Sequence, residues 1–264
     1  MAPPHDPECR LEMRNLSVAF GARAIQHDLS FSIRHGSIFA IMGGSGCGKS
    51  TVLKAMIGLL RPTAGKVIVD GEDYWAVDEA RRARIGRRFG VLFQSGALWS
   101  SMTVAENVAL PLQMFTKLSA EAIAVLIDLK LSFVGLATAA DRFPSELSGG
   151  MRKRVALARA LALDPEVLFF DEPSAGLDPV TSQRLDELIL ELSNGFGATV
   201  VIVSHELRSL FSICDDGVFL DAETKTAIAY GSPRALRDNC DHPTVRAFME
   251  SGQLEKYPAK EREP

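Results

Sequence analysis

The pattern of apolar and polar residues divides the chain into three stretches. In the first, short apolar or alternating runs bounded by turns predict strands with two helices among them. From about 97 to 160 these runs disappear and helical spacing takes over. Fully apolar runs return at 167–170 and 199–203, with a helical stretch over 182–192 between them. The sequence therefore predicts an α/β domain with an inserted α-helical subdomain.

Turn and capping residues set the expected limits of the individual elements. In the inserted block, Thr103 and Glu106 have the spacing of a capping box, and Ser119 precedes a further helix. The predicted strands cover 11–20, 28–33, 37–41, 66–71 and 89–93, and the predicted helices of the first stretch cover 51–60 and 78–88. Towards the end, 218–220 and 226–230 predict a hairpin, and 233–249 predicts short helices.

The two ends of the chain differ from the domain that we place over 11–240. Residues 1–10 are polar and proline-rich, and we expect a disordered start that lacks the apolar core of a secretory signal. Residues 241–264 predict a helix and a mobile tail, which we consider as a contact in a dimer. Since no apolar run approaches the roughly 20 residues that span a membrane, we expect a soluble chain that reaches membranes through a partner.

Charge and cysteine content narrow the functional classes. The formal net charge is −4, so the composition does not favour a nucleic-acid partner. The scattered cysteines, without Cys-x-x-Cys spacing, favour a reducing cytoplasm over a disulfide framework. One basic cluster is interpreted as a solvated helix face in preference to a docking surface. The cysteines are Cys9, Cys47, Cys214 and Cys240, and the cluster is Arg81, Arg82, Arg84, Arg87 and Arg88.

The segment after the predicted strand 37–41 fits the phosphate-binding loop G-x-x-x-x-G-K-[S/T]. Its glycines let the backbone turn N–H groups towards phosphate oxygens, and the next helix directs its positive N-terminus at them. Lys49 can reach the β- and γ-phosphates, and the Ser50 hydroxyl can bind Mg²⁺. A glycine-rich turn that binds nothing is the weaker interpretation, because strand, loop and helix are all present. The candidate nucleotide-binding residues are Gly43, Gly44, Ser45, Gly46, Cys47, Gly48, Lys49, Ser50 and Thr51.

Polar residues follow three other predicted strands. Ligands of parallel sheets bind beyond the carboxyl ends of the strands, so these residues could face one Mg-nucleotide. Asp171 suits a Mg²⁺ ligand, and Glu172 suits the general base that polarises the attacking water. Glu172 could instead be a surface acid, and His205 alone would usually be structural, although it could reach a γ-phosphate. Gln94 could bind Mg²⁺ or hold water.

A second glycine turn, Ser148, Gly149 and Gly150, stands at the start of a predicted helix and is an anion site of the same kind. One chain has one complete phosphate loop, and this turn lies in another subdomain. We therefore infer that the nucleotide is shared between two copies of the protein. Phe20, just before a turn, is either core or a stacking platform for an adenine ring.

Together these residues resemble the ATP-binding subunit of ABC transporters over about 11–230. Walker A is matched by Gly43–Thr51, and Walker B by Val167–Asp171 with Glu172 following. The LSGGQ signature is matched by Leu147–Met151, and the D-loop by Ser174–Asp178. Gln94 resembles the Q-loop glutamine, and His205 resembles the switch histidine. Met151 replaces the usual glutamine, and Phe20 stands where a tyrosine often stacks on adenine. The expected phosphate and stacking contacts survive both changes.

This resemblance implies a P-loop NTPase core of α/β class, with an N-terminal antiparallel β subdomain and the inserted α-helical subdomain. It implies an ATPase that uses ATP and Mg²⁺ and forms a head-to-tail homodimer. Each ATP would lie between Walker A of one chain and Ser148–Gly150 of the other, with Asp178 contributing. Hydrolysis would drive paired permease subunits in the membrane, and the helical subdomain would receive a coupling element from them.

Within ABC proteins, residues 93–108 resemble MlaF-like ATPases of Mla/MCE phospholipid-trafficking systems, as does the C-terminal segment 242–249. This likeness implies lipid transport between inner and outer membranes, supporting outer-membrane lipid asymmetry, at the cytoplasmic face of the bacterial inner membrane. It implies an MCE-type lipid-binding protein and a small cytoplasmic regulatory subunit as partners. An importer or exporter of another cargo, and a soluble ABC-type nucleotide switch without a permease, stay as alternatives.

Overall fold

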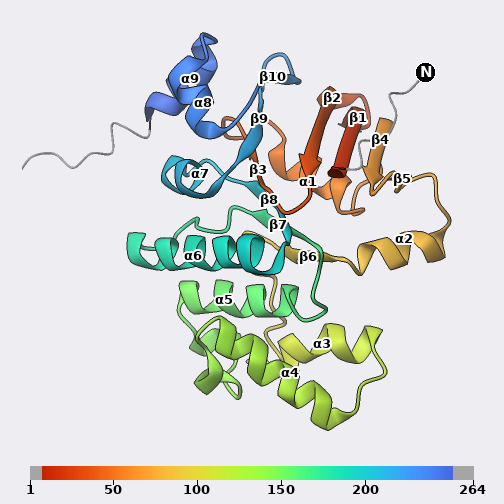
Figure 1. Cartoon of the computed structure of the whole chain (residues 1–264), viewed down its shortest axis with the longest axis vertical. Helices are drawn as coiled ribbons and strands as arrows, with labels where there is room; N and C mark the ends of the chain where they lie inside the picture. The colour runs from red at the N-terminus through yellow and green to blue at the C-terminus, as the bar shows by residue number, and fades with distance from the viewer. Residues whose placement is uncertain (1–7, 252–264) are drawn as a thin grey trace, which may run out of the picture.

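Two sheets of different types form the upper part of the molecule, and a block of helices lies below them (Figure 1). Within residues 8–251, which the computed structural model describes, the larger sheet has six strands in the order β10-β9-β3-β8-β7-β6. Neighbouring strands are parallel except for the pair β9 and β10, which forms the predicted hairpin. The strands are β3 (Ile38–Met42), β6 (Phe89–Leu92), β7 (Val167–Asp171), β8 (Thr199–Val203), β9 (Asp216–Leu220) and β10 (Ala227–Tyr230).

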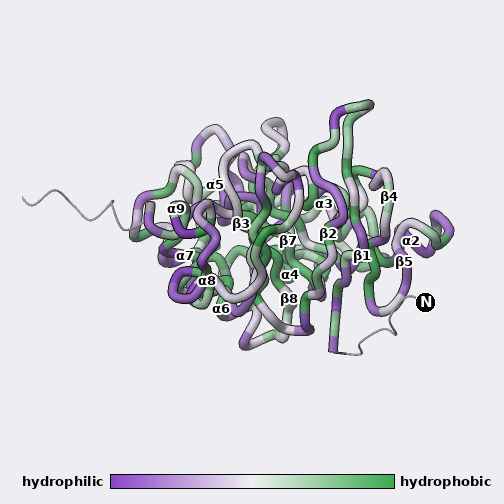
Figure 2. The backbone as a smooth tube through the Cα atoms, turned by 90° about the horizontal axis from the view of Figure 1, so that it is seen from above, coloured by the Kyte–Doolittle hydropathy of each residue, from purple (hydrophilic) through white to green (hydrophobic). Residues whose placement is uncertain are grey.

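Helices cover both faces of this sheet. The helices are α1 (Lys49–Met56), α2 (Glu79–Gly86), α3 (Val104–Phe115), α4 (Ala120–Phe133), α5 (Gly149–Ala160), α6 (Pro179–Phe196), α7 (Leu207–Ile213), α8 (Pro233–Asn239) and α9 (Pro243–Ser251). In β3, Phe39 and Ile41 pack in a core with α1, while Ala40 and Met42 pack in a core with α5 and α6. The central strands are therefore buried on both faces, which explains their uninterrupted apolar runs (Figure 2).

The smaller sheet is antiparallel, as the resemblance implied, with the order β2-β1-β4-β5. Its strands are β1 (Cys9–Phe20), β2 (Arg23–Arg34), β4 (Ala64–Val69) and β5 (Glu72–Asp73). The rings of Phe31 and Phe39 stack at 5.4 Å and join the two sheets. Because β1 begins at Cys9, the predicted disordered start over 1–10 is too long at its C-terminal end, and residues 1–7 lie outside the described chain.

Side-chain caps begin the helices of the lower block. The predicted capping box is confirmed: the Thr103 hydroxyl accepts from the Glu106 N–H, and the Glu106 carboxylate accepts from the Thr103 N–H. Ser119 caps α4 as predicted. Buried Asn107 donates to the carbonyls of Trp99, Met102 and Thr103 and so orders the loop before α3. Helices α3, α4 and α5 all lie within the range 97–160 given by the sequence.

Caps also explain where the predicted helix limits were wrong. Asp178 accepts from the N–H groups of Val180 and Thr181, so α6 begins at residue 179 and runs beyond 182–192 on both sides. Ser148 caps α5, which therefore begins at Gly149 and includes both glycines of the second glycine turn. Helix α1 is shorter than the predicted 51–60 at its C-terminal end, and the left-handed Gly58 follows it.

The C-terminal helices fold back onto the body of the same chain. Val245 and Met249 of α9 are buried, and the Phe248 ring meets Phe219 of β9 edge to face at 5.0 Å. Residues 252–264, which include most of the predicted mobile tail, lie outside the described chain. A dimer contact of 241–264 therefore stays a prediction. Within the described range, no helix has both the length and the apolar character to cross a membrane.

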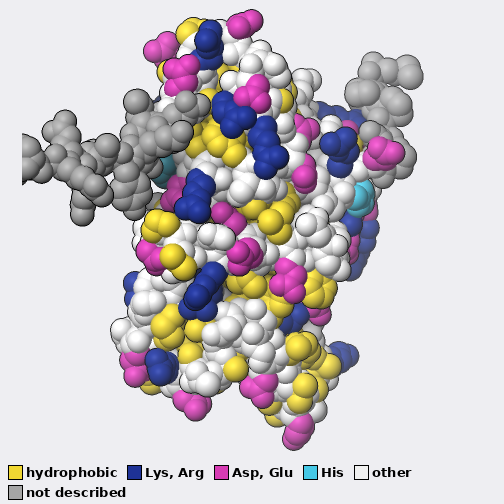
Figure 3. Space-filling view, turned by 60° about the vertical axis from the view of Figure 1, so that its left-hand side comes forward, with side chains coloured by type: hydrophobic (Ala, Val, Ile, Leu, Met, Phe, Trp, Pro, Cys, Tyr) yellow, Lys and Arg dark blue, Asp and Glu magenta, His cyan; other side chains and the backbone are white. Residues whose placement is uncertain are grey.

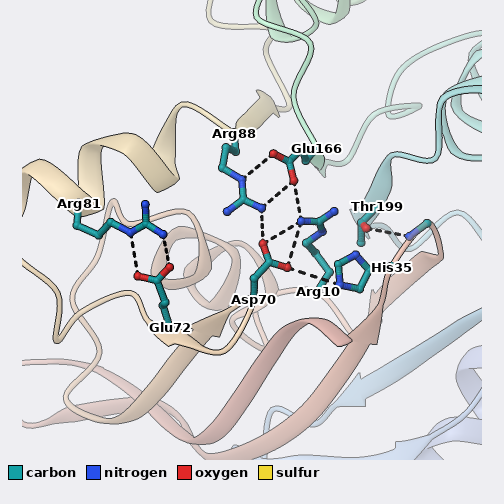
Figure 4. Close-up of polar contacts among 9 residues, drawn as sticks. Arg10, His35, Asp70, Glu72, Arg81, Arg88, Glu166 and Thr199 are labelled. Atoms are coloured by element: carbon teal, nitrogen blue, oxygen red, sulfur yellow. Dashed lines mark hydrogen bonds and ion pairs between the residues drawn. The ribbon is translucent and has the colours of Figure 1, made fainter. Parts of the chain in front are cut away.

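The arginine cluster is less solvated than its sequence indicated. Arg81 pairs with Glu72, and Arg88 pairs with Asp70 and Glu166 (Figure 4). Arg82 and Arg87 lie over the rings of Trp75 and Phe115. The interpretation as a solvated face is therefore wrong for Arg82 and Arg88, which are partly buried against a ring and two acids, whereas Arg81 and Arg87 stay more exposed. On the face shown in Figure 3, basic and acidic side chains are interspersed, so that face presents no field of a single sign.

Candidate nucleotide-binding site

The predicted phosphate loop connects β3 to α1 at the carboxyl edge of the parallel sheet. Gly43 and Gly48 have φ values of +142° and +104°, which side chains rarely allow, and a Cβ at Gly43 would lie 2.3 Å from the Leu220 carbonyl oxygen. Gln26, fully buried on β2, donates to the carbonyls of Cys47 and Asp221 at 2.7 and 2.8 Å. The small sheet thus supports the loop, a role that a glutamine in a strand pattern did not signal.

Lys49 and Ser50 are the two side chains of the loop with the clearest chemistry. The Lys49 ammonium donates to the carbonyls of Gly43 and Gly44 at 2.8 and 3.0 Å, which places a buried positive charge within the loop. The Ser50 hydroxyl donates to the Asp171 carboxylate at 2.8 Å. The structure therefore brings together Ser50 and Asp171, two residues predicted to bind Mg²⁺ from segments 121 residues apart.

Asp171 is the last residue of β7 and is only 7% exposed. Burial raises the pKa of Asp171, and the hydrogen bond from Ser50 opposes that rise. A buried carboxylate with this cost is stabilised by a cation, and hydroxyl and carboxylate oxygens are donors that Mg²⁺ prefers. The donor set of Ser50 and Asp171 therefore fits Mg²⁺.

Glu172 directly follows β7 in a left-handed conformation, with φ of +52°. Its N–H donates to the Val203 carbonyl at the end of β8, and Oε1 lies 2.8 Å from Nδ1 of His205. Its other carboxylate oxygen, Oε2, is buried without a hydrogen-bond partner in the described chain. A buried carboxylate oxygen without a donor is costly, so Oε2 is a candidate acceptor for a donor group that reaches the site when a ligand binds.

The remaining predicted ligands occupy separate positions. Phe20 is 56% exposed at the end of β1, so it is a free aromatic face rather than part of the core. Gln94 is exposed just after β6, next to β7 in the sheet. Asp178 uses both carboxylate oxygens to cap α6, accepting from Thr181 Oγ1 at 2.6 Å. Their nucleotide contacts stay predictions.

The second glycine turn packs closely against α6. Ser148 caps α5, and a Cβ at Gly150 would lie 2.7 Å from Thr181 of α6, so glycine is needed there. Helices α5 and α1 pack into different cores on opposite faces of the parallel sheet. One chain thus holds its two candidate phosphate sites, Ser148–Gly150 and the phosphate loop, on helices of opposite faces.

Two features of the site differ from the sequence-based view. A helix N-terminus can lower a thiol pKa, but burial raises the pKa of Cys47, which is only 2% exposed. The sequence also missed Lys153 and Arg159 of α5. The Lys153 ammonium binds carbonyls after β7, and the Arg159 guanidinium binds the carbonyls of Gly96 and Ala97. Alternation of basic and apolar residues along α5 does not reveal which basic residue is buried.

These features define a P-loop ATPase of α/β class. The family model for the ABC transporter matches residues 26–175. The chain belongs to the ABC transporter family, as one of its ATP-binding, ATP-hydrolysing subunits.

Individual relatives and structures give the same family. The intermembrane phospholipid transport system ATP-binding protein MlaF of Escherichia coli (strain K12) is 43% identical over 240 residues, covering 91% of this chain and 88% of that protein. The probable ribonucleotide transport ATP-binding protein mkl of Mycobacterium tuberculosis (strain H37Rv) is 39% identical over 92% of this chain and 67% of its own length. A dimeric post-hydrolysis structure of the ATP-binding cassette MJ0796, bound to ADP and Pi, has a TM-score of 0.77 and 30% identity, covering 85% of this chain and 99% of that chain.

Proposed function

We propose that this chain is the ATP-hydrolysing subunit of an ABC system that moves phospholipid between the inner and outer membranes. It would act at the cytoplasmic face of the bacterial inner membrane, bound to permease subunits, with an MCE-type lipid-binding protein and a small cytoplasmic regulator in the complex. The observation that carries the proposal is the 43% identity to a phospholipid transport ATPase over nearly the whole chain, together with an intact ATPase site.

In this proposal the chain binds ATP through the phosphate loop, with Lys49 on the β- and γ-phosphates and Phe20 stacked on the adenine. Ser50, Asp171 and Gln94 would hold Mg²⁺, which neutralises charge on the phosphates. The buried position of Asp171 and its bond to Ser50 support that role.

Glu172 would act as the general base in hydrolysis. Its carboxylate would accept a proton from the attacking water while the water oxygen bonds to the γ-phosphorus. The bond from the γ-phosphorus to the bridging oxygen breaks, and ADP and phosphate leave. His205, held at 2.8 Å by Oε1 of Glu172, directs its exposed ring towards the transferred phosphoryl group.

A homodimer would complete each site. The phosphate loop and Ser148–Gly150 belong to helices on opposite faces of one sheet, so a head-to-tail partner can bring its glycine turn to the nucleotide. The similar MJ0796 cassette is dimeric with ADP and Pi bound, which supports this arrangement.

The permease would dock on the helical block. Helices α3 and α4 flank an open groove of about 510 Å³, lined by Ala105, Ala109, Ile123 and Ile127 among others. Met114, 64% exposed, lies near the end of α3 and adds apolar surface to the helical block. A coupling helix that carries a few apolar side chains would fit such a groove.

A second candidate function differs from the first only in the transported cargo. The mycobacterial relative is named for ribonucleotide transport, so an ABC transporter of another cargo is the second candidate function. A tagged pull-down from gently solubilised membranes, read by mass spectrometry, separates the two. We expect a multi-span permease with an MCE-type protein, whereas a permease with a solute receptor would overturn the lipid cargo.

In the purified complex, Glu172→Gln should lower the ATPase rate at least about 100-fold. Undiminished turnover would overturn the role of Glu172.

A further inference from the structure

Lys153 is a buried lysine of α5 whose ammonium lies against the loop that follows β7. The residue is 7% exposed. Its Nζ donates to the carbonyl oxygens of Glu172, Pro173 and Ala175 at 3.2, 2.7 and 2.6 Å. An ammonium carries three N–H donors, so these three acceptors use its full capacity. Hydrogen bonds from a charged donor are stronger than neutral ones, and here three converge on four residues of chain.

Burial makes this lysine costly unless its charge is used. Removal from water lowers the pKa of Lys153, while the attraction of Glu206 and Glu172 opposes that change. An apolar side chain of similar length would fill the same space without the desolvation cost. Neighbouring basic residues of α5 bind elsewhere: Arg152 donates to the Leu147 carbonyl and Arg154 to the Val134 carbonyl. Of these three neighbouring basic residues, Lys153 is therefore the one whose side chain contacts the loop after β7.

The loop held by Lys153 carries the most constrained residue of the site. Glu172 has a left-handed backbone, which is unfavourable for a residue with a side chain. Its N–H is fixed by Val203 and its carbonyl by Lys153, so both neighbouring peptide groups are held. The direction of the carboxylate towards His205 depends on this backbone, because a change of the Glu172 torsions would turn the side chain away.

We propose that Lys153 is a positioning residue for ATP hydrolysis, whose ammonium clamps the backbone of 172–175 and so aims the Glu172 carboxylate at the attacking water. The inference rests on the proposed function, in which Glu172 is the general base. Because Ser148 caps α5, the same lysine links the second candidate phosphate site of the chain to the loop that carries Glu172.

The first test is steady-state ATP hydrolysis by the full-length chain in its purified complex. Lys153→Met keeps the length of the side chain and removes the donors. We expect kcat to fall at least about 10-fold while KM for ATP changes less than about 2-fold, since misaimed catalytic groups lose rate rather than binding. Lys153→Arg keeps the charge, but its planar donors match fewer of the three carbonyls, so its kcat should lie between wild type and Lys153→Met at an unchanged KM.

A matched control is Lys130→Met. Lys130 also has a largely buried side chain, and it pairs with Asp164, away from the loop after β7. Its kcat and KM should stay within about 2-fold of wild type. If Lys130→Met lowers kcat as much as Lys153→Met, the loss comes from general loosening of the helical block, and the inference is wrong.

The second test separates positioning from assembly. In a Glu172→Gln background, Lys153→Met should leave the affinity for a fluorescent ATP analogue and ATP-dependent dimerisation unchanged. Loss of either property would mean that Lys153 supports binding or assembly, which would overturn the inference.

If Lys153→Met does not fold, Lys153→Arg decides: a wild-type kcat overturns the inference, and a lowered kcat at unchanged KM supports it. If Glu172→Gln retains full turnover, the proposed role of Glu172 is wrong, and the inference that depends on it is wrong too. If Glu172→Gln loses turnover but Lys153→Met and Lys153→Arg keep it, only the inference about Lys153 is wrong.

Discussion

The two edges of the parallel sheet use ionisable side chains in opposite ways. At the amino edge, Arg88 and Glu166 directly precede β6 and β7. With Arg10 and Asp70 they form a closed network in which each charge meets two opposite charges (Figure 4). At the carboxyl edge of the same strands, the Asp171 side chain accepts a hydrogen bond only from the Ser50 hydroxyl within the described residues, and Glu172 leaves one buried oxygen without a partner there.

The pKa values of the acids record this difference. Burial raises the pKa of Asp70, but the hydrogen bonds and charges of Arg88 and Arg10 outweigh it and lower the pKa overall. The hydrogen bond from Arg88 lowers the pKa of Glu166. For Asp171 burial prevails and the pKa is raised. The acids of the amino-edge network are thus stabilised in their ionised form, whereas the ionised form of Asp171 is disfavoured by burial.

The largest expected effect is on activity, at the carboxyl edge. Asp171→Asn should lower kcat for ATP about 100-fold or more, because an amide replaces a charged Mg²⁺ ligand. The melting temperature at pH 7.5 should be unchanged or higher, since the substitution removes a buried charge whose pKa is raised. ATPase assays and calorimetry on one preparation measure both. Asp164→Asn, at an exposed acid, is the control. A clear loss of stability in Asp171→Asn would place Asp171 with the structural charges and remove the contrast.

Arg88→Met tests the amino edge and should give the reverse result. Two partly buried carboxylates lose their shared cation, so we expect the free energy of unfolding to fall by about 2–3 kcal/mol. At 20 °C, kcat should stay within about 3-fold of wild type.

The pH dependence of Arg88→Met follows from the lowered pKa values of Asp70 and Glu166. A lowered pKa contributes stability above the unfolded-state value, about 4, and this contribution disappears as the pH falls through the folded-state value. The difference in melting temperature between wild type and variant should therefore be full at pH 7 and shrink below about pH 4. A difference that stays constant would show that Arg88 acts through packing alone.

Asp186→Asn sharpens the comparison with an acid that lies behind the site. Asp186 on α6 is 8% exposed and accepts from Ser209 of α7 at 2.8 Å, while its Oδ1 has no partner in the described chain. Burial raises its pKa to about 6; the Ser209 bond opposes this, and Glu206 adds to it. The cost of the ionised form therefore develops from about pH 4, the unfolded-state pKa, and is full above about pH 6.

We expect Asp186→Asn to raise the free energy of unfolding by about 1–2 kcal/mol at pH 8. The gain should vanish below about pH 3, where the wild-type carboxyl is protonated in both states. Urea unfolding at the two pH values measures it, with Ser209→Ala as the matched control that removes the partner hydroxyl but keeps the acid. A loss of stability at pH 8 would show that the carboxylate is paired by a group such as Arg208 more strongly than its burial opposes it.

The sequence predicts most of the residues at the carboxyl edge of the sheet, whereas it predicts almost none of the contacts at the amino edge. The phosphate loop, Asp171, Glu172 and His205 could be found because they form local motifs at strand ends, and parallel topology places such ends together. The amino-edge network joins Arg10, Asp70 and Glu166, which lie up to 156 residues apart, and no local pattern records such pairing.

Lys153 and Gln26 show the same limit on a smaller scale. A lysine in a basic helix and a glutamine in a strand both match solvent-facing patterns, and only the packed neighbours make them buried donors to backbone carbonyls. Helix limits were wrong where a cap such as Asp178 acts from outside the apolar period. The fold class and the chemistry of the site depend on local motifs, whereas supports and stabilising networks depend on contacts made across the chain.

The smallest expected effect comes from the second ion pair in the same view, Arg81 with Glu72 (Figure 4). The guanidinium donates through two nitrogens to both oxygens of Glu72, a paired geometry like that of Arg88 with Glu166, yet both side chains are well exposed. Solvent and salt screen such a pair, so Arg81→Met should change the melting temperature by less than about 2 °C, with no effect on ATP turnover. Calorimetry of Arg81→Met and Arg88→Met in parallel, at low and high salt, makes the comparison. Equal losses in the two variants would mean that burial within the network adds nothing, and the contrast between the sheet edges would then reflect hydrogen-bond geometry instead of desolvation.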